Sequence, residues 1–300
     1  MRPGHVALRV LELDEALHHY KNIIGLIETD RDDQGRVYLK AWDEHDHHSV
    51  VLREADTPGM DYLGFRVLDR EALLEYDGRL RNAGFATEVI PAGEHKRCGE
   101  RIRFEAPTGH LFELYAEKDK VGNGLPLINP DPWPDGLVGL HPSHFDHCLF
   151  YGREFAPTVK LFIEVLDFDL VEQALDGEEQ VVAFLSCSTK AHDIAFIKNE
   201  QQNKLHHVSF HVESWSDLLR AGDILGKNRV PIDTTPNRHG FLRGQTIYFY
   251  DPSGNRNEVF AGGYPWYSDM PVVTWTMDEI ERAIFFHNGE VSPKYLNAVT

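Results

Sequence analysis

The segment QTIYFYDPSGNRNEVF, residues 245–260, decides the fold, because an earlier segment of the chain repeats it. RIRFEAPTGHLFELY, residues 101–115, aligns with it and places Glu113 against Glu258, an offset of 145 residues. The proline and the glycine of the turn between the two apolar stretches coincide as well. Similarity at a fixed long interval is the signature of a duplicated structural unit.

Two further pairs of segments extend the repeat. DYLGFRV, residues 61–67, lies over HHVSFHV, residues 206–212, again at an offset of 145. GHVALRV, residues 4–10, lies over DHCLFYG, residues 146–152, at an offset of 142. The change of offset is the size of a small loop insertion, so the sequence predicts one domain that occurs twice in the chain.

A stretch rich in proline, asparagine and glycine separates the two copies. GNGLPLINPDPWPDG, residues 122–136, is typical of a linker, since prolines and glycines interrupt both strands and helices. We therefore expect an N-terminal repeat over residues 1–135 and a C-terminal repeat over residues 136–300.

Within each copy the pattern of apolar residues predicts a strand, a helix and further strands, twice over. HVALRV, residues 5–10, precedes DEALHHYKNIIGL, residues 14–26, where apolar residues recur near helical spacing. A second helix, REALLEYDGRLRNAG, ends at Gly84, a residue type that favours helix C-termini. We predict an α+β fold of four βαβββ units in two duplicated, barrel-like domains, with antiparallel strands around a cup and helices outside.

The composition is that of a water-soluble globular protein, with 42% hydrophobic and 26% charged residues. No apolar stretch approaches the ~18 residues of a membrane-spanning helix, and the first residues lack the apolar segment of a signal peptide. A formal net charge of −18 argues against nucleic-acid or anionic-membrane partners, which are bound by clustered Lys and Arg. Three widely spaced cysteines without a CxxC motif disfavour a disulfide framework. We expect a cytoplasmic protein.

The second copy carries three side chains with metal-ligand chemistry. His147 and His207 each open the first predicted strand of a unit, and Glu258 lies on the last strand. A single strand histidine is more often a core residue, and a carboxylate after a turn is usually solvated. Together they indicate a metal site, because Glu258 between apolar neighbours needs a cation or a donor to offset burial. Two imidazoles and one carboxylate are typical of non-haem iron(II) oxygenases.

His206 competes with His207 for the ligand role. Strand alternation predicts that the two side chains point to opposite faces, and alignment with the strand at residues 147–150 selects His207. In the first copy the equivalent residues are His5, Tyr62 and Glu113. Tyrosine at the central position breaks the trio, so we expect the N-terminal repeat to keep the fold without a functional metal site.

Two segments are left out of the predicted site. EHDHH, residues 44–48, falls at a turn between strands of the first copy, and we interpret it as a solvated turn. The last twenty residues, 281–300, are expected to form a helix and a tail, which either covers the site or contacts another subunit.

These motifs resemble the catechol 2,3-dioxygenase (metapyrocatechase) family of extradiol dioxygenases, in the vicinal oxygen chelate superfamily. The resemblance covers essentially the whole chain and is carried by STKAHDIAFI, KLHHVSFHVESW and RHGFLRGQTIYFYDPSGNRNEVF. It implies that O2 cleaves catechol and simple substituted catechols to 2-hydroxymuconate semialdehyde, in the degradation of aromatic compounds. It also implies Fe(II) held by His147, His207 and Glu258, and a homotetrameric assembly.

The resemblance implies further site residues. His192 resembles the active-site acid/base histidine, although its first-copy counterpart is His48, so a role in the fold alone stays open. His239 and Tyr248 resemble the residues that hydrogen-bond the substrate oxygens. Four residues match substrate-binding wall positions: Phe184, Phe241, Leu242 and Ile284. Leu242 and the adjacent arginine depart from common family residues, which leaves the preference among substituted catechols open.

Two other functions remain open on the sequence. An isomerase of the glyoxalase kind would use zinc or nickel and assemble its ligands from two halves, which the tyrosine in the first copy disfavours. A non-catalytic binding protein of the same fold would lack the metal trio. Neither a dinucleotide-binding fingerprint nor a P-loop is present, so we expect no nicotinamide or flavin.

Overall fold

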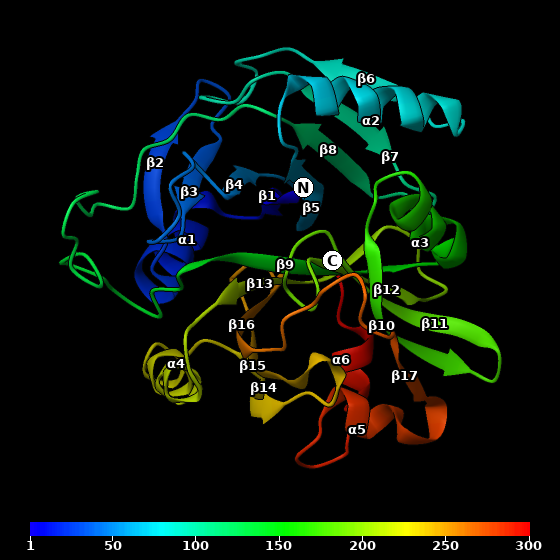
Figure 1. Ribbon diagram of the computed structural model, residues 1–300. Helices are drawn as coiled ribbons and strands as arrows, with labels where there is room; N and C mark the ends of the chain where they lie inside the picture. Colours follow the sequence, from blue (N-terminus) through cyan, green and yellow to red (C-terminus); the bar gives the residue numbers. More distant parts are fainter.

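The computed structural model describes residues 1–300 and divides them into two halves, each built on one β-sheet (Figure 1). The first half contains eight strands, two α-helices and one π-helical stretch. In chain order these are β1 (Arg2–Val10), α1 (Leu13–Leu17), η1 (His18–Ile24), β2 (Ile27–Arg31), β3 (Val37–Lys40), β4 (Val50–Glu54), β5 (Gly59–Arg66), α2 (Arg70–Asn82), β6 (Thr87–Ile90), β7 (Arg101–Glu105) and β8 (Leu111–Tyr115).

The second half repeats this series and adds a C-terminal extension. The repeated elements are β9 (His144–Gly152), α3 (Phe155–Glu164), β10 (Asp169–Asp176), β11 (Glu179–Ser186), β12 (Ile194–Lys198), β13 (Lys204–His211), α4 (Trp215–Lys227), β14 (Ile232–Arg238), η2 (Phe241–Arg243), β15 (Gly244–Tyr250) and β16 (Arg256–Gly262). The extension contains β17 (Val273–Thr276), η3 (Met277–Glu279), α5 (Ile280–Ile284) and α6 (Pro293–Asn297).

The order of strands is the same in both sheets. It runs β2-β3-β4-β1-β5-β8-β7-β6 in the first sheet and β10-β11-β12-β9-β13-β16-β15-β14 in the second, where β17 is added beside β10. Every strand of the first sheet thus has its counterpart eight strands later. The predicted fold of four βαβββ units in two duplicated domains is confirmed.

The prediction of antiparallel strands is only partly right. The first strand of each unit pairs in parallel with the last strand of the same unit, as β1 does with β4 and β9 with β12. The helix that follows each first strand provides the crossover that a parallel pair requires. The sheets are therefore mixed.

The predicted helices differ in detail from the observed ones. The segment 14–26 forms a short α-helix that continues as the π-helical η1 and ends at Gly25, whose φ of 94° favours glycine. The second helix, α2, begins after the N-cap Asp69, whose side chain accepts from the N–H of Ala72, and ends at Asn82. Gly84 follows with a φ of 89° and turns the chain toward β6.

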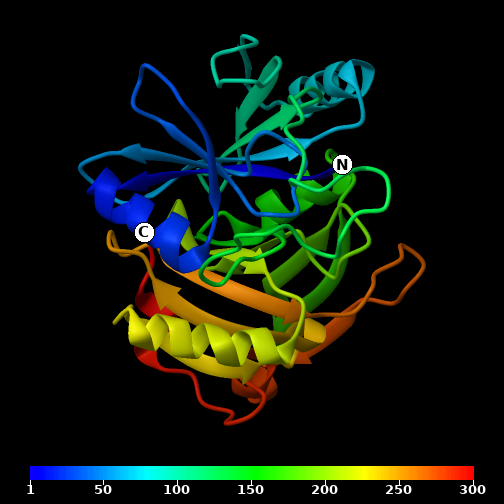
Figure 2. The same ribbon diagram turned by 90° about the vertical axis from the view of Figure 1, so that its left-hand side faces the viewer.

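One hydrophobic core joins the two halves. A single cluster of 51 buried residues contains side chains from both sheets and from the helices that cover them. Phe112 of β8 packs against Phe150 of β9 and Phe162 of α3, with ring centroids 5.8 and 5.0 Å apart. Figure 2 shows the two sheets lying one above the other, with α4 along the outer face of the lower sheet. The halves therefore support each other through packed aromatic rings.

The C-terminal extension lies against the second sheet (Figure 1). Backbone N–H and C=O groups of Thr300 bond those of Leu205 in β13, at 3.1 and 2.9 Å. Three of its residues line the cavity described below: Ile284, Tyr295 and Leu296. The tail thus covers the cup of the second sheet. None of the helices has the length and apolar character needed to cross a membrane.

Candidate metal centre

Strand register places polar side chains next to one another on the inner face of the second sheet. His147 of β9 faces Ser209 of β13, Ser209 faces Glu258 of β16, and Glu258 faces Tyr248 of β15. His207 lies two residues before Ser209 and shares its face, because side chains alternate along a strand. Positions far apart in the sequence therefore converge on one point.

The three predicted metal ligands meet at that point. Nε2 of His147 lies 3.0 Å and Nε2 of His207 lies 3.3 Å from Oε2 of Glu258, and the two ring nitrogens are 3.2 Å apart. All three side chains are buried, and Oε2 of Glu258 makes no hydrogen bond. A divalent transition-metal ion would give these three atoms a common partner, so the donor set fits such an ion.

Neighbouring groups fix the orientation of these ligands. The carboxylate of Asp146 accepts from Nδ1–H of His147 at 2.6 Å, which leaves a lone pair on Nε2. The ammonium group of Lys190 donates to the other oxygen of Asp146 at 2.9 Å. The hydroxyl of Thr246 donates to Oε1 of Glu258. These supporting groups were not predicted from the sequence.

The electrostatics of two of the three groups, Glu258 and His207, favour the protonation states that bind a metal. Burial alone would lower the pKa of His147, but Asp146 and Glu258 outweigh burial and raise it. Burial alone would raise the pKa of Glu258, but His207 and His147 outweigh burial and hold that pKa well below its ordinary value. Burial lowers the pKa of His207 to about 4, although Glu258 opposes the shift. The carboxylate is therefore anionic and the imidazole of His207 neutral near pH 7, as metal ligation requires.

His206 does not point away from His207, so the prediction of opposite faces is wrong. A β-bulge in β13 between Leu205 and His207 interrupts the alternation of side chains. The Nδ1 atoms of the two rings lie 2.7 Å apart. Nε2 of His206 contacts the backbone carbonyl of Tyr295 at 3.1 Å and stays outside the group around Glu258.

The other predicted polar residues line the same cavity. The ring centroid of His192 lies 3.9 Å from that of His147. Nδ1–H of His239 donates to the carbonyl of Ile284, and its Nε2 lies 3.0 Å from the hydroxyl of Tyr248. Burial, and then the nearby carboxylate, raise the pKa of Tyr248 well above its ordinary value. Tyr248 therefore keeps its proton and donates it to His239.

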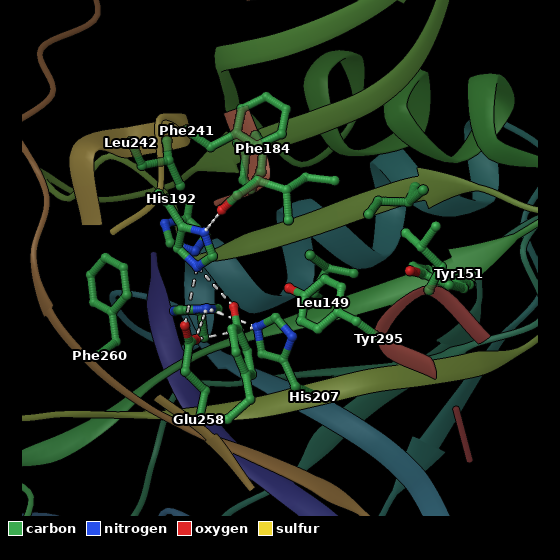
Figure 3. A pocket seen from close by; sticks show the side chains of 16 residues that line it. Leu149, Tyr151, Phe184, His192, His207, Phe241, Leu242, Glu258, Phe260 and Tyr295 are labelled. Atoms are coloured by element: carbon green, nitrogen blue, oxygen red, sulfur yellow. Dashed lines mark hydrogen bonds and ion pairs between the residues drawn. The ribbon is translucent and has the colours of Figure 1, made fainter. Parts of the chain in front are cut away.

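The cavity around these groups is mostly apolar, with eleven hydrophobic residues among the sixteen that line it. The predicted wall residues are all present: Phe184, Phe241, Leu242 and Ile284. Six lining residues were not predicted: Leu149, Tyr151, Ile197, Phe260, Tyr295 and Leu296. Figure 3 shows Phe184 and Phe241 on one side of the polar groups and Tyr295 on another.

A sequence signal existed for some of the missed residues. Leu149 and Tyr151 alternate with His147 along β9, so a period of two places all three on the face of the site. Tyr295 and Leu296 belong to α6, and no pattern in the sequence fixes where this short helix packs.

A buried carboxylate holds the loop that carries Leu242. Leu242 and Arg243 both have φ of 57°, in the left-handed region that side chains disfavour. Glu172 accepts from the N–H of Leu242 at 2.9 Å, from the hydroxyl of Tyr264 at 2.8 Å and from Nε1 of Trp275 at 2.6 Å. Strained backbone persists where surrounding contacts impose it, so these bonds shape one wall of the cavity. Glu172 was not predicted from the sequence.

The first copy contains a related cluster of buried histidines in which the hydrogen bonding differs. His5, His48 and His95 are buried, and one ring nitrogen of each lies within 4.8 Å of the others. However, the ammonium group of Lys118 donates to Nδ1 of His5 at 2.9 Å. A neutral His5 then carries its proton on Nε2, the atom that would have to face an ion.

Two cationic side chains also form ion pairs with the buried carboxylate of the first copy, that of Glu113. The guanidinium of Arg101 binds Oε2 of Glu113 at 2.7 Å, and that of Arg103 binds Oε1 at 2.6 Å. Both Arg101 and Glu113 are fully buried. The hydroxyl of Tyr62, at the position equivalent to His207, contacts His95. Charges of the chain itself thus compensate the buried carboxylate.

The interpretation of residues 44–48 as a solvated turn is wrong for most of the segment. Asp46, His47 and His48 are buried, at 7%, 3% and 0% exposure. The carboxylate of Glu44 accepts from the backbone N–H of Phe145 at 2.9 Å. Asp46 pairs with Arg2 and Arg66, and the ring of His48 packs among other side chains of the first half, so most of the turn is buried within that half.

Comparisons with known proteins agree with this geometry. Residues 60–119 match the family described as catechol 2,3-dioxygenase-like N-terminal domain, and residues 144–259 match the glyoxalase/bleomycin resistance protein/dioxygenase superfamily. The chain is 54% identical to a metapyrocatechase of Pseudomonas sp. (strain CF600) over 302 residues, covering 100% of this chain and 98% of that protein. A manganese-dependent 2,3-dihydroxybiphenyl 1,2-dioxygenase of Geobacillus genomosp. 3 is 28% identical over 97% of this chain and 94% of its own.

A solved structure is similar in both sequence and shape. The crystal structure of the 2,3-dioxygenase LapB from Pseudomonas sp. KL28 is 53% identical, with a TM-score of 0.90, and the match covers 92% of this chain and 97% of that one. The duplicated fold and the buried His–His–Glu group define a member of the superfamily that contains glyoxalases and extradiol dioxygenases. Identity over the full length is more specific. The chain belongs to the catechol 2,3-dioxygenase (metapyrocatechase) family and is an extradiol ring-cleaving enzyme.

Proposed function

We propose that this protein uses iron(II) and O2 to open catechol and simple substituted catechols beside one hydroxyl group, giving 2-hydroxymuconate semialdehyde. The observation that carries the proposal is the approach of His147 Nε2, His207 Nε2 and Glu258 Oε2 to within 3.3 Å of one another at an apolar cavity. Similarity to the metapyrocatechase of Pseudomonas sp. (strain CF600) supports catechols as the substrate class and aromatic degradation as the context.

His147, His207 and Glu258 are the proposed ligands of the iron. When bound, iron(II) lowers the pKa of a catechol hydroxyl and links the aromatic ring electronically to O2. A ligand set confined to one side leaves the other side open to small molecules. Manganese(II) is the second candidate metal, because one relative is described as manganese-dependent.

Three further side chains are proposed to handle protons and substrate oxygens. Burial, and then the neighbouring His147, lower the pKa of His192 well below its ordinary value, so its ring is neutral and can accept a proton from a catechol hydroxyl. The same ring then donates that proton to an oxygen atom during ring opening. Tyr248 keeps its proton; its hydroxyl donates to His239 in this structure and is proposed to turn and donate to a substrate oxygen when a catechol binds.

The wall of the cavity suits a single aromatic ring. Four residues are the proposed substrate contacts: Phe184, Phe241, Leu242 and Ile284. A small number of polar groups in an apolar pocket orient a ligand and exclude bulk water from the reacting atoms. The side chain of Leu242, held in place through Glu172, is the proposed limit on ring substituents.

The N-terminal repeat, residues 1–135, is proposed to be free of a functional metal, and the C-terminal repeat, residues 136–300, to be catalytic. The contacts of Lys118 with His5 and of Arg101 with Glu113 support this division, because positive charge repels a cation. A cytoplasmic homotetramer is the proposed state of the enzyme. Three cysteines without a disulfide are consistent with a reducing compartment.

Anaerobic reconstitution tests the proposed function. Metal-free protein is loaded with iron(II) or manganese(II), and catechol is added before air. The proposal predicts O2 uptake in a 1:1 ratio to catechol and a yellow ring-opened product, with iron more active than manganese. If neither metal gives O2 uptake or a ring-opened product, the isomerase and the binding protein remain as the alternative functions.

A further inference from the structure

Two adjacent histidines of β13 contact each other beside the metal centre. The bulge at Leu205 brings the ring of His206 to the same side as that of His207, and their Nδ1 atoms lie 2.7 Å apart. Both rings are buried, at 1% and 2% exposure. Two nitrogens at this distance share one hydrogen, so one ring must be the donor and the other the acceptor.

The surroundings of His206 decide the direction of that hydrogen bond. Nε2 of His206 lies 3.1 Å from the carbonyl oxygen of Tyr295, and a carbonyl can only accept, so Nε2 carries the hydrogen. The guanidinium of Arg256 donates to the same carbonyl at 3.0 Å, and a ring that carries its single hydrogen on Nε2 has its lone pair on Nδ1. Nδ1 of His206 is then the acceptor.

The acceptor on His206 determines which nitrogen of His207 is free. His207 donates Nδ1–H to His206, so its lone pair lies on Nε2, the atom 3.3 Å from Glu258. Asp146 has the same effect on His147 by accepting from its Nδ1–H. In their neutral forms, both proposed ligands therefore direct the lone pair of Nε2 toward the same point.

The first copy shows the opposite arrangement at an equivalent position. There the ammonium of Lys118 donates to Nδ1 of His5, which leaves the hydrogen on Nε2, and this atom has no partner. The comparison within one chain indicates that the group behind each ring selects the tautomer of the histidine in front of it.

The carbonyl that holds His206 belongs to the C-terminal segment. Arg256 donates to this carbonyl at 3.0 Å, and the ring of Tyr295 packs on the ring of His206 with centroids 4.9 Å apart. Thr300 pairs through its backbone with Leu205, the residue before His206. The segment is therefore attached to β13 at Tyr295 and again at Thr300.

We propose that His206 is a positioning residue, which holds His207 in the tautomer that binds a metal, and that the Tyr295 carbonyl of the C-terminal segment holds His206 in turn. This inference rests on the proposed metal site. It makes the final residues of the chain part of the metal centre that they cover.

Matched substitutions separate this role from simple packing. His206→Leu and His206→Asn introduce side chains of similar volume, but only the amide oxygen of asparagine can accept from His207. Loss of a group behind a ligand weakens metal binding by about 10- to 100-fold, so we expect that loss for His206→Leu and recovery of most of the affinity for His206→Asn. Affinity is measured by competition of metal-free protein with a chelator for cobalt(II), whose absorption bands also report the ligand geometry.

A control substitution accounts for the cost of removing any buried histidine. Nε2 of His110 contacts the carbonyl of Lys204 at 3.2 Å, so His110→Leu removes a similar hydrogen bond away from the ligands. It should lower the unfolding temperature and leave cobalt affinity unchanged. Equal cobalt affinity in wild type and His206→Leu, or equal losses in His206→Leu and His206→Asn, would overturn the proposal.

Removal of residues 293–300 provides a second, independent measurement. This deletion takes away the Tyr295 carbonyl but keeps His206, and circular dichroism checks that the shortened protein is folded. Because the Tyr295 carbonyl acts through His206, His206→Leu should cause little further loss of affinity in the shortened protein. Additive losses would show that the two groups act independently and would contradict the proposal. Glu258→Ala distinguishes the two proposals, since unchanged cobalt binding in that variant would refute the proposed metal site itself.

Discussion

Replacing Asp146 tests how the charge behind a ligand contributes to metal binding. The carboxylate is 2% exposed and makes three close contacts, to Nδ1 of His147 at 2.6 Å, to Lys190 at 2.9 Å and to Nε2 of His144 at 3.3 Å. Burial alone would raise the pKa of Asp146, but Lys190 and the neighbouring imidazoles hold that pKa well below its ordinary value. The group is therefore anionic throughout the range in which the enzyme can be assayed.

The magnitude follows from the kind of hydrogen bond that is lost. In Asp146→Asn the amide oxygen still accepts from His147, so the tautomer is kept and only the charge is removed. Hydrogen bonds to charged groups contribute about 1.5–3 kcal/mol and neutral ones about 0.5–1.5 kcal/mol, a difference of about 1 kcal/mol or somewhat more. Each 1.4 kcal/mol is tenfold, so metal affinity should fall about tenfold in Asp146→Asn. Asp146→Ala loses the acceptor as well and should reach about 100-fold.

Asp193 provides the control for this experiment. Its carboxylate lies 3.3 Å from the same Lys190 but does not contact His147. Asp193→Asn should therefore lower the unfolding temperature without a comparable loss of metal affinity. The assay is anaerobic competition between metal-free protein and a chelator for iron(II). Equal affinity in Asp146→Asn and wild type, or equal losses in Asp146→Asn and Asp193→Asn, would refute the reasoning.

Three further predictions concern other parts of the molecule. Glu258→Ala should lose bound iron, whereas His192→Ala should keep iron and lose turnover. Metal analysis and O2 uptake measure the two effects, and equal iron loss in both variants would contradict the assignment of Glu258 as a ligand and His192 as an acid/base residue. Burial lowers the pKa of His19 to about 4 against about 6.5 when unfolded, so the unfolded chain binds the extra proton and stability falls as pH drops from 6.5 toward 4. Between pH 7 and pH 5 wild type should lose about 2 kcal/mol more unfolding free energy than His19→Gln, measured by urea denaturation of metal-free protein, and parallel pH profiles would exclude this effect. Arg101→Met leaves the buried Glu113 with one cation fewer and should cost about 3 kcal/mol of stability by urea denaturation while the iron content stays at one per chain.

The fold was predictable because the chain contains two copies of one domain, whose sequences can be aligned with each other. The match of residues 101–115 with 245–260 fixed the duplication, and the two sheets indeed share one strand order. The parallel pairs within each unit were not predicted, because alternation of apolar residues shows that a strand exists but does not name its neighbour. The π-helical stretch after α1 likewise has no signal in residue spacing.

The candidate site was predictable where chemistry and register coincide. His147, His207 and Glu258 are recognisable from their residue types and their places on strands, and the structure brings them together. His206 was placed wrongly because a bulge changes the face of one residue without changing the apolar pattern around it. Glu172 was missed because its partners, a backbone N–H and an indole among them, lie on segments remote in sequence.

The contact between η1 and β16 has a consequence for any attempt to isolate the catalytic half. His19 and Tyr20 bond Asn257 and Asp251, which flank the turn that delivers Glu258 to its position. Residues 136–300 expressed alone would present bare phenyl rings to water and leave that turn without its outer support. The N-terminal half thus supports, from outside, the turn that positions a proposed ligand of the C-terminal half.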